Sequence, residues 1–306
     1  MDGNGFVWLY EDMICPGIIS SVYGGAVAVL VENETVSAIG PSSLTDGLVV
    51  GDKVTVDTAG EPARIMSVEP RRTEIARMHG DGDSRHRAER RVMAANIDTA
   101  VIVATAMQPE FEPELVDRYI VLCRAAGIEP VVCLNKVDLT EIRHPALALY
   151  REQRLTVVET SPKTGLGLDD LRDAIRAKMA ILLGKSGAGK SSLINALLPH
   201  ANVETQGLSE RAQQGQHTTA RSDIHVWEPG SCLIDTPGIR TLDVSHLDED
   251  DVSLGFPDIL KLAQACRFAD CRHETEPGCA VRTAIETEML PTWRWKSYRN
   301  IRTDDE

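Results

Sequence analysis

The sequence predicts an α/β core with a six-stranded, mostly parallel sheet, preceded by a small β module and followed by a short module that contains clustered cysteines and a histidine. Three observations support this prediction. Residues 1–72 contain short alternating runs rich in Val, Gly and Thr, apolar strands alternate with amphipathic helices from residue 98 onward, and three cysteines and a histidine lie close together near the C-terminus. At 306 residues the chain has the length of two or three domains.

The composition limits the classes of function. The formal net charge is −14, so any contact with RNA would be local, because phosphates bind lysine and arginine. No segment approaches the roughly 18 apolar residues of a membrane span and no apolar signal run follows Met1, so we expect a cytoplasmic protein without membrane contact. Four of the seven cysteines stand in apolar surroundings and are predicted core residues: Cys15, Cys123, Cys133 and Cys232.

Residues 1–72 form the predicted β module. Runs such as 26–31 and 52–57 lie between Gly, Pro and Asp residues, as strands do. The module is acidic, with four Lys/Arg against ten Asp/Glu. Residues 73–97 are predicted to be a mobile basic linker, because seven arginines and four acids fall between residues 70 and 91. These arginines fit either a solvated charged loop or a contact with RNA.

The core is predicted to span residues 98–242. Strands are expected near 98–104, 130–135, 155–160, 179–183, 222–228 and 231–235, and helices near 112–126, 144–153, 168–178 and 190–198. This alternation is typical of a mostly parallel sheet that helices cover on both faces.

A glycine-rich phosphate-binding loop (P-loop) is predicted between the strand at 179–183 and the helix that begins near 190. Glycines let backbone N–H groups turn toward phosphate oxygens, and the helix adds the positive end of its dipole. The strand-loop-helix setting disfavours an ordinary glycine-rich turn. We expect Lys190 to contact the β- and γ-phosphates and Ser191 to ligate magnesium. The loop comprises Gly184, Lys185, Ser186, Gly187, Ala188, Gly189, Lys190, Ser191 and Ser192.

Guanine specificity is predicted from Asn135, Lys136, Val137 and Asp138, which follow an apolar strand. The Asp138 carboxylate can accept from N1–H and the 2-amino group of guanine, a donor pair that adenine lacks. Alone, these residues would also fit a capped turn; beside the P-loop they favour GTP. At the end of the next strand, Ser161 and Lys163 are expected to support the base site.

Two further segments match the parts of a GTPase that respond to the γ-phosphate. Asp235 is expected to hold magnesium through water, and Gly238 to reach the γ-phosphate. Thr218 or Thr219 closes on magnesium, with Thr218 preferred.

A different group must orient the attacking water, because Ile239 stands where Ras-type enzymes carry glutamine. His217 is the candidate catalytic residue, together with Thr218 and Lys190, and an exposed loop histidine is the alternative. We expect slow intrinsic turnover that depends on a partner.

The order of the motifs is permuted. A conventional GTPase has the P-loop first, whereas here the guanine motif precedes it. Six strands remain, so the sheet can close with the cut in a different loop. The sequence therefore predicts a circularly permuted α/β P-loop GTPase core that binds GTP or GDP with Mg²⁺. Since the chain passes from Gly238 into the C-terminal module, a γ-phosphate contact there could reposition that module.

Residues 243–306 form the predicted C-terminal module. Three thiolates and one imidazole within 14 residues make a closed tetrahedral set for one structural zinc ion: Cys266, Cys271, His273 and Cys279. A small segment with little apolar content needs such a metal to fold. Unligated cysteines are the alternative. A helical stretch with Trp293, Trp295 and Tyr298 is expected to end the chain.

In this order, the motifs resemble those of the RsgA (YjeQ) family of bacterial small ribosomal subunit biogenesis GTPases. The resemblance covers almost the whole chain and includes Gly-Gln-His-Thr-Thr at 215–219. It implies an OB-fold-like barrel over residues 1–72, a permuted GTPase core and a C-terminal zinc-binding helical domain, acting on the small ribosomal subunit and its rRNA late in maturation. It also implies that residues 135–138 and 184–192 bind GTP, that the Cys/His cluster binds zinc and that His217 is catalytic. The acidic barrel departs from the family pattern, and the linker arginines or the zinc module can replace its contact.

The leading hypothesis is a monomeric GTPase that binds the small ribosomal subunit in its GTP form and hydrolyses GTP when the subunit stimulates it. One alternative is a GTP-regulated switch with another partner, which a subunit-stimulated rate would distinguish. The other is an ATP-using P-loop enzyme, which competition between GTP and ATP would expose.

Overall fold

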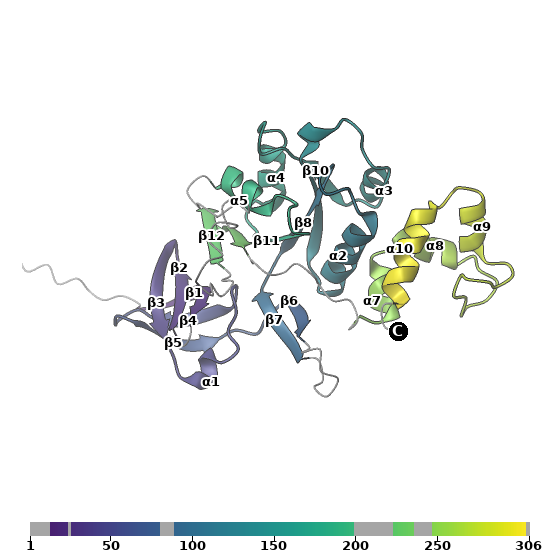
Figure 1. Cartoon of the computed structure of the whole chain (residues 1–306). Coiled ribbons are helices and arrows are strands. Elements are labelled where there is room, and N and C mark those ends of the chain that lie inside the picture. Colours follow the sequence, from purple (N-terminus) through teal and green to yellow (C-terminus); the bar gives the residue numbers. More distant parts are fainter. Residues whose placement is uncertain (1–12, 24–25, 80–88, 199–222, 236–246, 304–306) are drawn as a thin grey trace, which may run out of the picture.

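The computed structural model describes residues 13–23, 26–79, 89–198, 223–235 and 247–303. A small barrel, a central sheet with its helices and a helical C-terminal module follow one another along the chain. The barrel and the C-terminal module lie on opposite sides of the central sheet (Figure 1).

The N-terminal barrel is closed by five strands in the order β1-β2-β3-β5-β4. Apolar side chains alternate into its interior, as Val54 and Val56 do from β4. A short helix, α1 (Ser42–Thr45), precedes β4. The predicted barrel is therefore confirmed, with strands β1 (Ile14–Tyr23), β2 (Ala26–Val31), β3 (Glu34–Ile39), β4 (Lys53–Asp57) and β5 (Ala63–Val68).

The expected mobile linker instead contains a two-stranded antiparallel sheet of β6 (Glu74–His79) and β7 (Glu89–Ala95). The prediction of a mobile linker was wrong for these residues. It was based on the number of arginines and overlooked the apolar positions between them. Ile75 and Ala94 pair across the two strands and are buried. Just before β6, Arg71 donates from Nε to the fully buried Asp52 carboxylate at 2.7 Å, which ties this sheet to the barrel.

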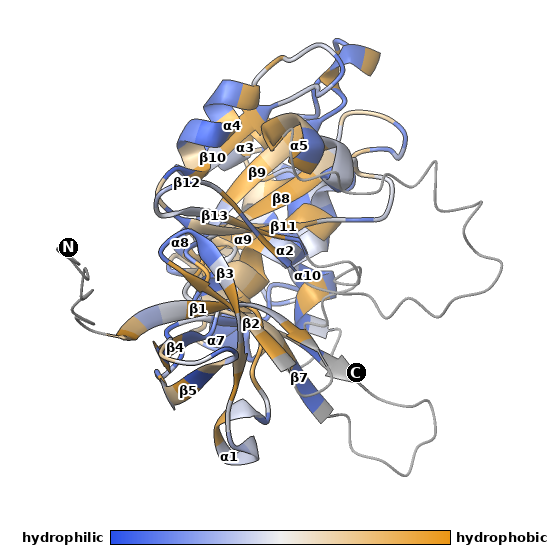
Figure 2. Cartoon of the chain, turned by 90° about the vertical axis from the view of Figure 1, so that its left-hand side faces the viewer, coloured by the Kyte–Doolittle hydropathy of each residue, from blue (hydrophilic) through white to orange (hydrophobic). Residues whose placement is uncertain are grey.

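The central sheet has the order β10-β9-β8-β11-β13-β12, and β12–β13 is its one antiparallel pair. All five residues of β11 are buried, as expected for a parallel strand that is covered on both faces. Figure 2 shows the inner strands β8, β9 and β11 as mostly hydrophobic. The six predicted strands are confirmed as β8 (Thr99–Thr105), β9 (Glu129–Asn135), β10 (Thr156–Glu159), β11 (Met179–Leu183), β12 (Asp223–Glu228) and β13 (Ser231–Asp235).

Helices cover both faces of this sheet. One buried cluster joins the sheet to α2 (Pro113–Ala125) and α3 (Ala146–Glu152), and a second joins it to α4 (Leu168–Ile175) and α5 (Lys190–Leu197). A short 3-10 helix, η1 (Val137–Leu139), follows β9. Three of the four cysteines predicted to be core residues are buried in these clusters, and Cys15 is half-buried in the barrel.

The strand order confirms the permutation. The chain enters the sheet at the central strand β8, continues outward through β9 and β10, returns to β11 beside β8, and completes the other half with β12 and β13. The predicted fold class, a permuted GTPase core between a barrel and a small C-terminal module, is therefore confirmed.

The C-terminal module consists of α7 (Glu249–Leu254), α8 (Pro257–Ala263), α9 (Ala280–Glu286) and α10 (Thr292–Thr303). Its buried cluster includes Phe256, Ile259, Val281 and Ile301, and also Val121 from α2 of the core. In the described part of the chain, no helix combines the length and apolar character needed to cross a bilayer.

Candidate nucleotide site and metal centre

The P-loop connects β11 to α5, as the sequence predicted. Gly184 has φ +142°, and a Cβ there would lie 2.3 Å from the carbonyl oxygen of Val103. Gly189 has φ +94°, and a Cβ there would lie 2.3 Å from Nδ2 of Asn135. Both positions therefore require glycine, because a side chain would collide with β8 or with the guanine motif.

Lys190 is the first residue of α5 and turns back into the P-loop. Its Nζ donates to the carbonyl oxygens of Gly184 at 2.6 Å and of Lys185 at 3.1 Å. Ser186 and Gly187 are exposed at the tip of the loop, and Ser191 and Ser192 follow on the first turn of α5. The ammonium group and the N-terminus of α5 thus lie at the same end of the loop, where an anion is stabilised.

The guanine motif is held against the P-loop by a buried amide. Nδ2 of Asn135 donates to the carbonyl oxygen of Ala188 at 2.9 Å, and the Thr160 hydroxyl donates to Oδ1 of Asn135 at 3.2 Å. Asn135 is 1% exposed, so its side chain joins the two loops and does not face solvent.

Ser161 and Lys163 converge on Asp138. The Ser161 hydroxyl donates to Oδ1 of Asp138 at 2.8 Å, and Nζ of Lys163 lies 3.9 Å from Oδ2. Lys136 adopts φ +60° next to this carboxylate. The structure thus brings together the residues that the sequence assigned to the base site.

Asp235 ends β13 directly opposite Asp223 on β12. Burial is the largest cause that raises the pKa of the Asp235 carboxyl, and Asp223 raises it further. His225 and Lys190 act in the opposite direction. Asp235 and the P-loop lysine therefore interact electrostatically, as expected for residues that share a phosphate-magnesium site.

Several predicted residues lie outside the described residues: His217, Thr218, Thr219, Gly238 and Ile239. The assignments of a catalytic histidine, a switch threonine and a γ-phosphate contact therefore stay predictions.

Two contacts of the segment between β8 and α2 were not predicted from the sequence. Nζ of Lys185 in the P-loop lies 2.7 Å from Oε1 of Glu112. Lys136 donates to the carbonyl oxygen of Gln108. Glu112 and Lys185 are 73 positions apart, and no motif marks Glu112, so only the fold brings this pair together.

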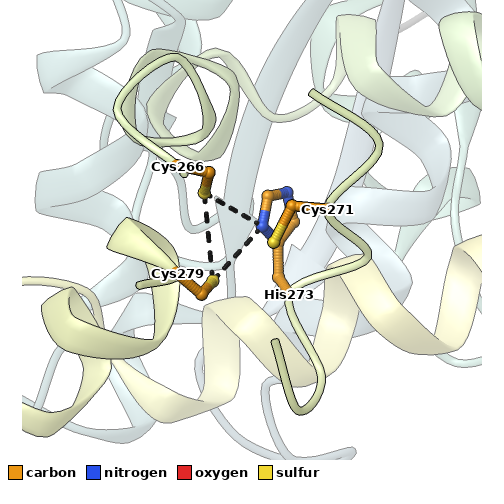
Figure 3. A group of neighbouring side chains, drawn as sticks. All are labelled: Cys266, Cys271, His273 and Cys279. Carbon is orange, nitrogen blue, oxygen red and sulfur yellow. Dashed lines mark hydrogen bonds between the residues drawn. The ribbon is translucent and has the colours of Figure 1, made fainter. Parts of the chain in front are cut away.

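The four predicted metal ligands lie together in the C-terminal module (Figure 3). Their ligand atoms all lie within 4.8 Å of one another, and the two sulfur atoms of Cys266 and Cys279 are 3.9 Å apart. Nδ1 of His273 lies 3.5 Å and 3.4 Å from these sulfur atoms. A tetrahedral zinc ion with bonds of about 2.3 Å to sulfur would place its ligands roughly 3.5 to 3.8 Å apart. The donor set, Cys266, Cys271, His273 and Cys279, therefore fits zinc in both chemistry and spacing.

The loop that carries His273 is closed by Glu276. Its carboxylate accepts from the backbone N–H groups of Arg272, Glu274 and Thr275 at 2.9 to 3.0 Å. Backbone donors, its own N–H first and then that of Arg272, lower the pKa of Glu276 to about 2. His273 itself adopts φ +63°, so this tight turn directs the imidazole toward the thiols.

Comparison with known proteins agrees with this geometry. The RsgA GTPase family profile matches residues 68–245. The small ribosomal subunit biogenesis GTPase RsgA of Pseudomonas putida is 38% identical over 260 residues, which cover 83% of this chain and 74% of that protein. The crystal structure of YjeQ from Thermotoga maritima superposes with a TM-score of 0.71 at 25% identity, covering 95% of this chain and 98% of YjeQ. That of YloQ, a circularly permuted GTPase, gives 0.70 at 27% identity, covering 97% and 96%. With its P-loop, guanine motif and permuted sheet, the chain is a GTP hydrolase and belongs to the RsgA family of circularly permuted GTPases.

Proposed function

We propose that this GTPase acts in the late maturation of the small ribosomal subunit: it binds the subunit in its GTP form, and subunit-stimulated hydrolysis drives its release. The observation that carries this proposal is the 38% identity, over 83% of the chain, to a protein named for small-subunit biogenesis. The Cys/His cluster beside a permuted GTPase core supports it.

In this proposal the two loops at the end of the sheet bind GTP. Asp138 accepts from the guanine base, and Ser161 and Lys163 hold that carboxylate in place. Lys190 and the backbone N–H groups of residues 184–192 bind the phosphates. Asn135 acts by tying these groups to the P-loop, since its amide is buried against Ala188.

Magnesium and the attacking water belong to the same proposal. Ser191 and Thr218 ligate magnesium, Asp235 holds it through water, and Gly238 contacts the γ-phosphate. Magnesium supplies charge stabilisation for the phosphoryl group that is transferred. His217 orients the water. His217→Ala should bind GTP normally and lose the stimulated rate, and a retained rate would show that another group performs this step.

We also propose that the chain is a cytoplasmic monomer that contacts rRNA locally through its C-terminal module. Helix α10 has four basic residues and no acidic ones: Arg294, Lys296, Arg299 and Arg302. Lys296 and Arg299 are exposed. In contrast, Arg71, Arg72 and Arg90 near the β6–β7 sheet form ion pairs with acidic side chains. Zinc would hold the loops beside α10.

The proposed domain organisation keeps its boundaries at residues 72, 97 and 242.

Phosphate release from GTP tests this function. The rate is measured with purified small ribosomal subunits, with large subunits as the matched control, and at one fixed low salt concentration because phosphate contacts depend on salt. The small subunit should raise the rate at least about tenfold, a barrier lowered by roughly 1.4 kcal/mol. GTP binding without stimulation would instead favour a switch with another partner.

A further inference from the structure

The C-terminal module shares helix α2 with the GTPase core. Val121 of α2 belongs to the buried cluster of the module, and a Cβ at Gly255 would lie 2.3 Å from a Val121 methyl carbon. The backbone that joins α7 to α8 therefore lies directly on α2. The module completes its hydrophobic core with a helix of the GTPase core, so movement of one relative to the other would expose that surface.

Polar contacts join α2 to the module at three positions along the helix. Asn300 Nδ2 donates to Oε2 of Glu114 at 3.0 Å in the first turn of α2. Arg294 donates to Oδ1 of Asp117 at 2.7 Å one turn later. Arg124 in the last turn donates to the carbonyl oxygen of Leu254 at 2.7 Å. The module is thus attached along the whole length of α2.

The second of these contacts, between Arg294 and Asp117, is fully buried. The Arg294 and Asp117 side chains are both 0% exposed. Arg294 also donates to both carboxylate oxygens of Asp258 at 3.0 Å, and its guanidinium lies 4.1 Å from the centroid of the Phe256 ring. A guanidinium with this many fixed partners holds α2, α8 and α10 in one arrangement.

The N-terminal end of α2 reaches the nucleotide site. Glu112 immediately precedes α2 and pairs with Lys185 of the P-loop at 2.7 Å. Four residues earlier, the carbonyl oxygen of Gln108 accepts from Lys136 of the guanine motif. Residues 108–112 therefore hold both nucleotide-binding loops and continue directly into the helix that the module packs against.

We propose that α2 couples the nucleotide site to the C-terminal module, and that Glu112 is the positioning residue for this coupling. A nucleotide that fixes the P-loop also fixes the start of α2 through the Glu112–Lys185 pair, and α2 transmits this order to α10. The P-loop and the guanine motif contact the base and the β-phosphate, which GDP and GTP share. Both nucleotides therefore stabilise the module, and the γ-phosphate is not required.

This inference rests on guanine-nucleotide binding by the family and not on the ribosomal partner. Its tests use the full-length, zinc-loaded protein without subunits, so failure here is distinguishable from failure of the proposed ribosomal function.

Amide hydrogen exchange of α10 tests the coupling directly. GDP and a non-hydrolysable GTP analogue should each slow exchange in α10 by about threefold, a factor within the range expected of a half-exposed ion pair such as Glu112–Lys185. In Glu112→Gln, protection of the P-loop by nucleotide should remain, whereas most of the slowing in α10 should disappear. Glu110→Gln makes the same charge change in the same segment at an exposed residue without a described ion pair, and it should behave like the parent protein.

The reciprocal experiment starts from the module. By linkage, a change that populates the loosened module weakens nucleotide binding, at most by the factor by which nucleotide stabilises the module. Asn300→Ala removes one half-buried contact to α2, and the Glu114 carboxylate that loses its partner stays in contact with water. It should weaken GDP binding by up to about threefold. Combined with Glu112→Gln, its effect should shrink, because one of the two contacts between residues 108–112 and the nucleotide loops is already lost.

Two results would overturn the proposal. One is slowing in α10 that appears with the GTP analogue and not with GDP, because the signal would then depend on the γ-phosphate. The other is unchanged slowing in Glu112→Gln together with fully independent effects of the two substitutions on GDP affinity. Thermal denaturation of each variant confirms that it is folded, and Glu112→Asp should recover part of the coupling.

Discussion

Arg294→Met is expected to destabilise the C-terminal module strongly. The parent side chain is buried and pairs with Asp117 at 2.7 Å and with Asp258 at 3.0 Å. Methionine fills a similar volume but leaves the buried Asp117 carboxylate without its cation. Breaking a buried ion pair in this way costs about 3 to 5 kcal/mol. Loss of the pair with Asp258 adds less to this free-energy cost, because the Asp258 side chain keeps some contact with water.

The size of this loss should depend on pH through Asp117. Burial is the main cause that raises the pKa of Asp117 from 3.8 to about 6, although Arg294 opposes it. Because the folded-state pKa is the higher one, this carboxyl contributes stability that is full below pH 3.8 and is lost as the pH rises through about 6. The loss is about 3 kcal/mol, at about 1.36 kcal/mol for each pKa unit. Without Arg294 the folded-state pKa rises further, so the loss continues to higher pH.

Denaturant unfolding followed by tryptophan fluorescence measures this effect, since Trp293 and Trp295 lie on α10. The free-energy difference between Arg294→Met and the parent protein should be larger at pH 8 than at pH 5.5. Asp117→Asn in the Arg294→Met background should recover part of the loss at pH 8, because it removes the uncompensated charge. A loss below about 1 kcal/mol, far under the cost of breaking a buried pair, or an equal loss at both pH values, would refute this reasoning.

Three further substitutions test the nucleotide site and the metal centre. Asp138→Ala should weaken GDP binding by about 10- to 100-fold, the value of a hydrogen bond to a charged group, in a displacement assay; unchanged affinity would exclude the base contact. Gly189→Ala should weaken GDP binding more than Gly187→Ala, since a Cβ at Gly189 collides at 2.3 Å whereas the space at Gly187 is open, and equal effects would contradict the packing argument. Glu276→Gln should release zinc to a chelator faster than Glu274→Gln, because Glu276 closes the His273 loop through three backbone N–H groups; equal release rates would show that the loop does not depend on it.

The core and its motifs were predictable because their signals are local. Each buried strand is one apolar run, and the P-loop and the guanine motif are continuous segments whose residue types are fixed by backbone geometry and base chemistry. The β6–β7 sheet was missed because its arginines dominate the composition, while Ile75 and Ala94, which hold it in place, are two scattered residues.

The contacts that join the parts of the molecule could not be predicted from the sequence. Glu112 and Lys185 meet only because β8 and β11 are neighbours in the sheet, so that the segments following them lie at the same edge. Arg294 belongs to a helix of mostly polar residues and looks like a surface residue in the sequence. Its burial depends on Asp117, which is 177 positions away.

Two separate sets of contacts hold the C-terminal module, the metal ligands and the contacts with α2. Removal of zinc should loosen the part that the metal holds first. The metal ligands lie at the end of α8, in the following loop and at the N-cap of α9. Helix α10 is held instead through its own Arg294 and Asn300, which contact α2. Its described links to the ligand loop are the edge contact between His273 and Trp295, with ring centroids 6.1 Å apart, and a hydrogen bond of 3.5 Å from Arg302 to the carbonyl oxygen of Arg272. Chelation should therefore accelerate hydrogen exchange in residues 264–279 well before residues 292–303, because an aromatic pair and a single hydrogen bond contribute only about 0.5 to 1.5 kcal/mol each. Residues 280–286 should follow α10, because Val281 and Ala284 share a buried cluster with Tyr298 and Ile301. If α10 lost its protection at the same time as the ligand loop, zinc would support the whole module and α2 would not hold α10 independently.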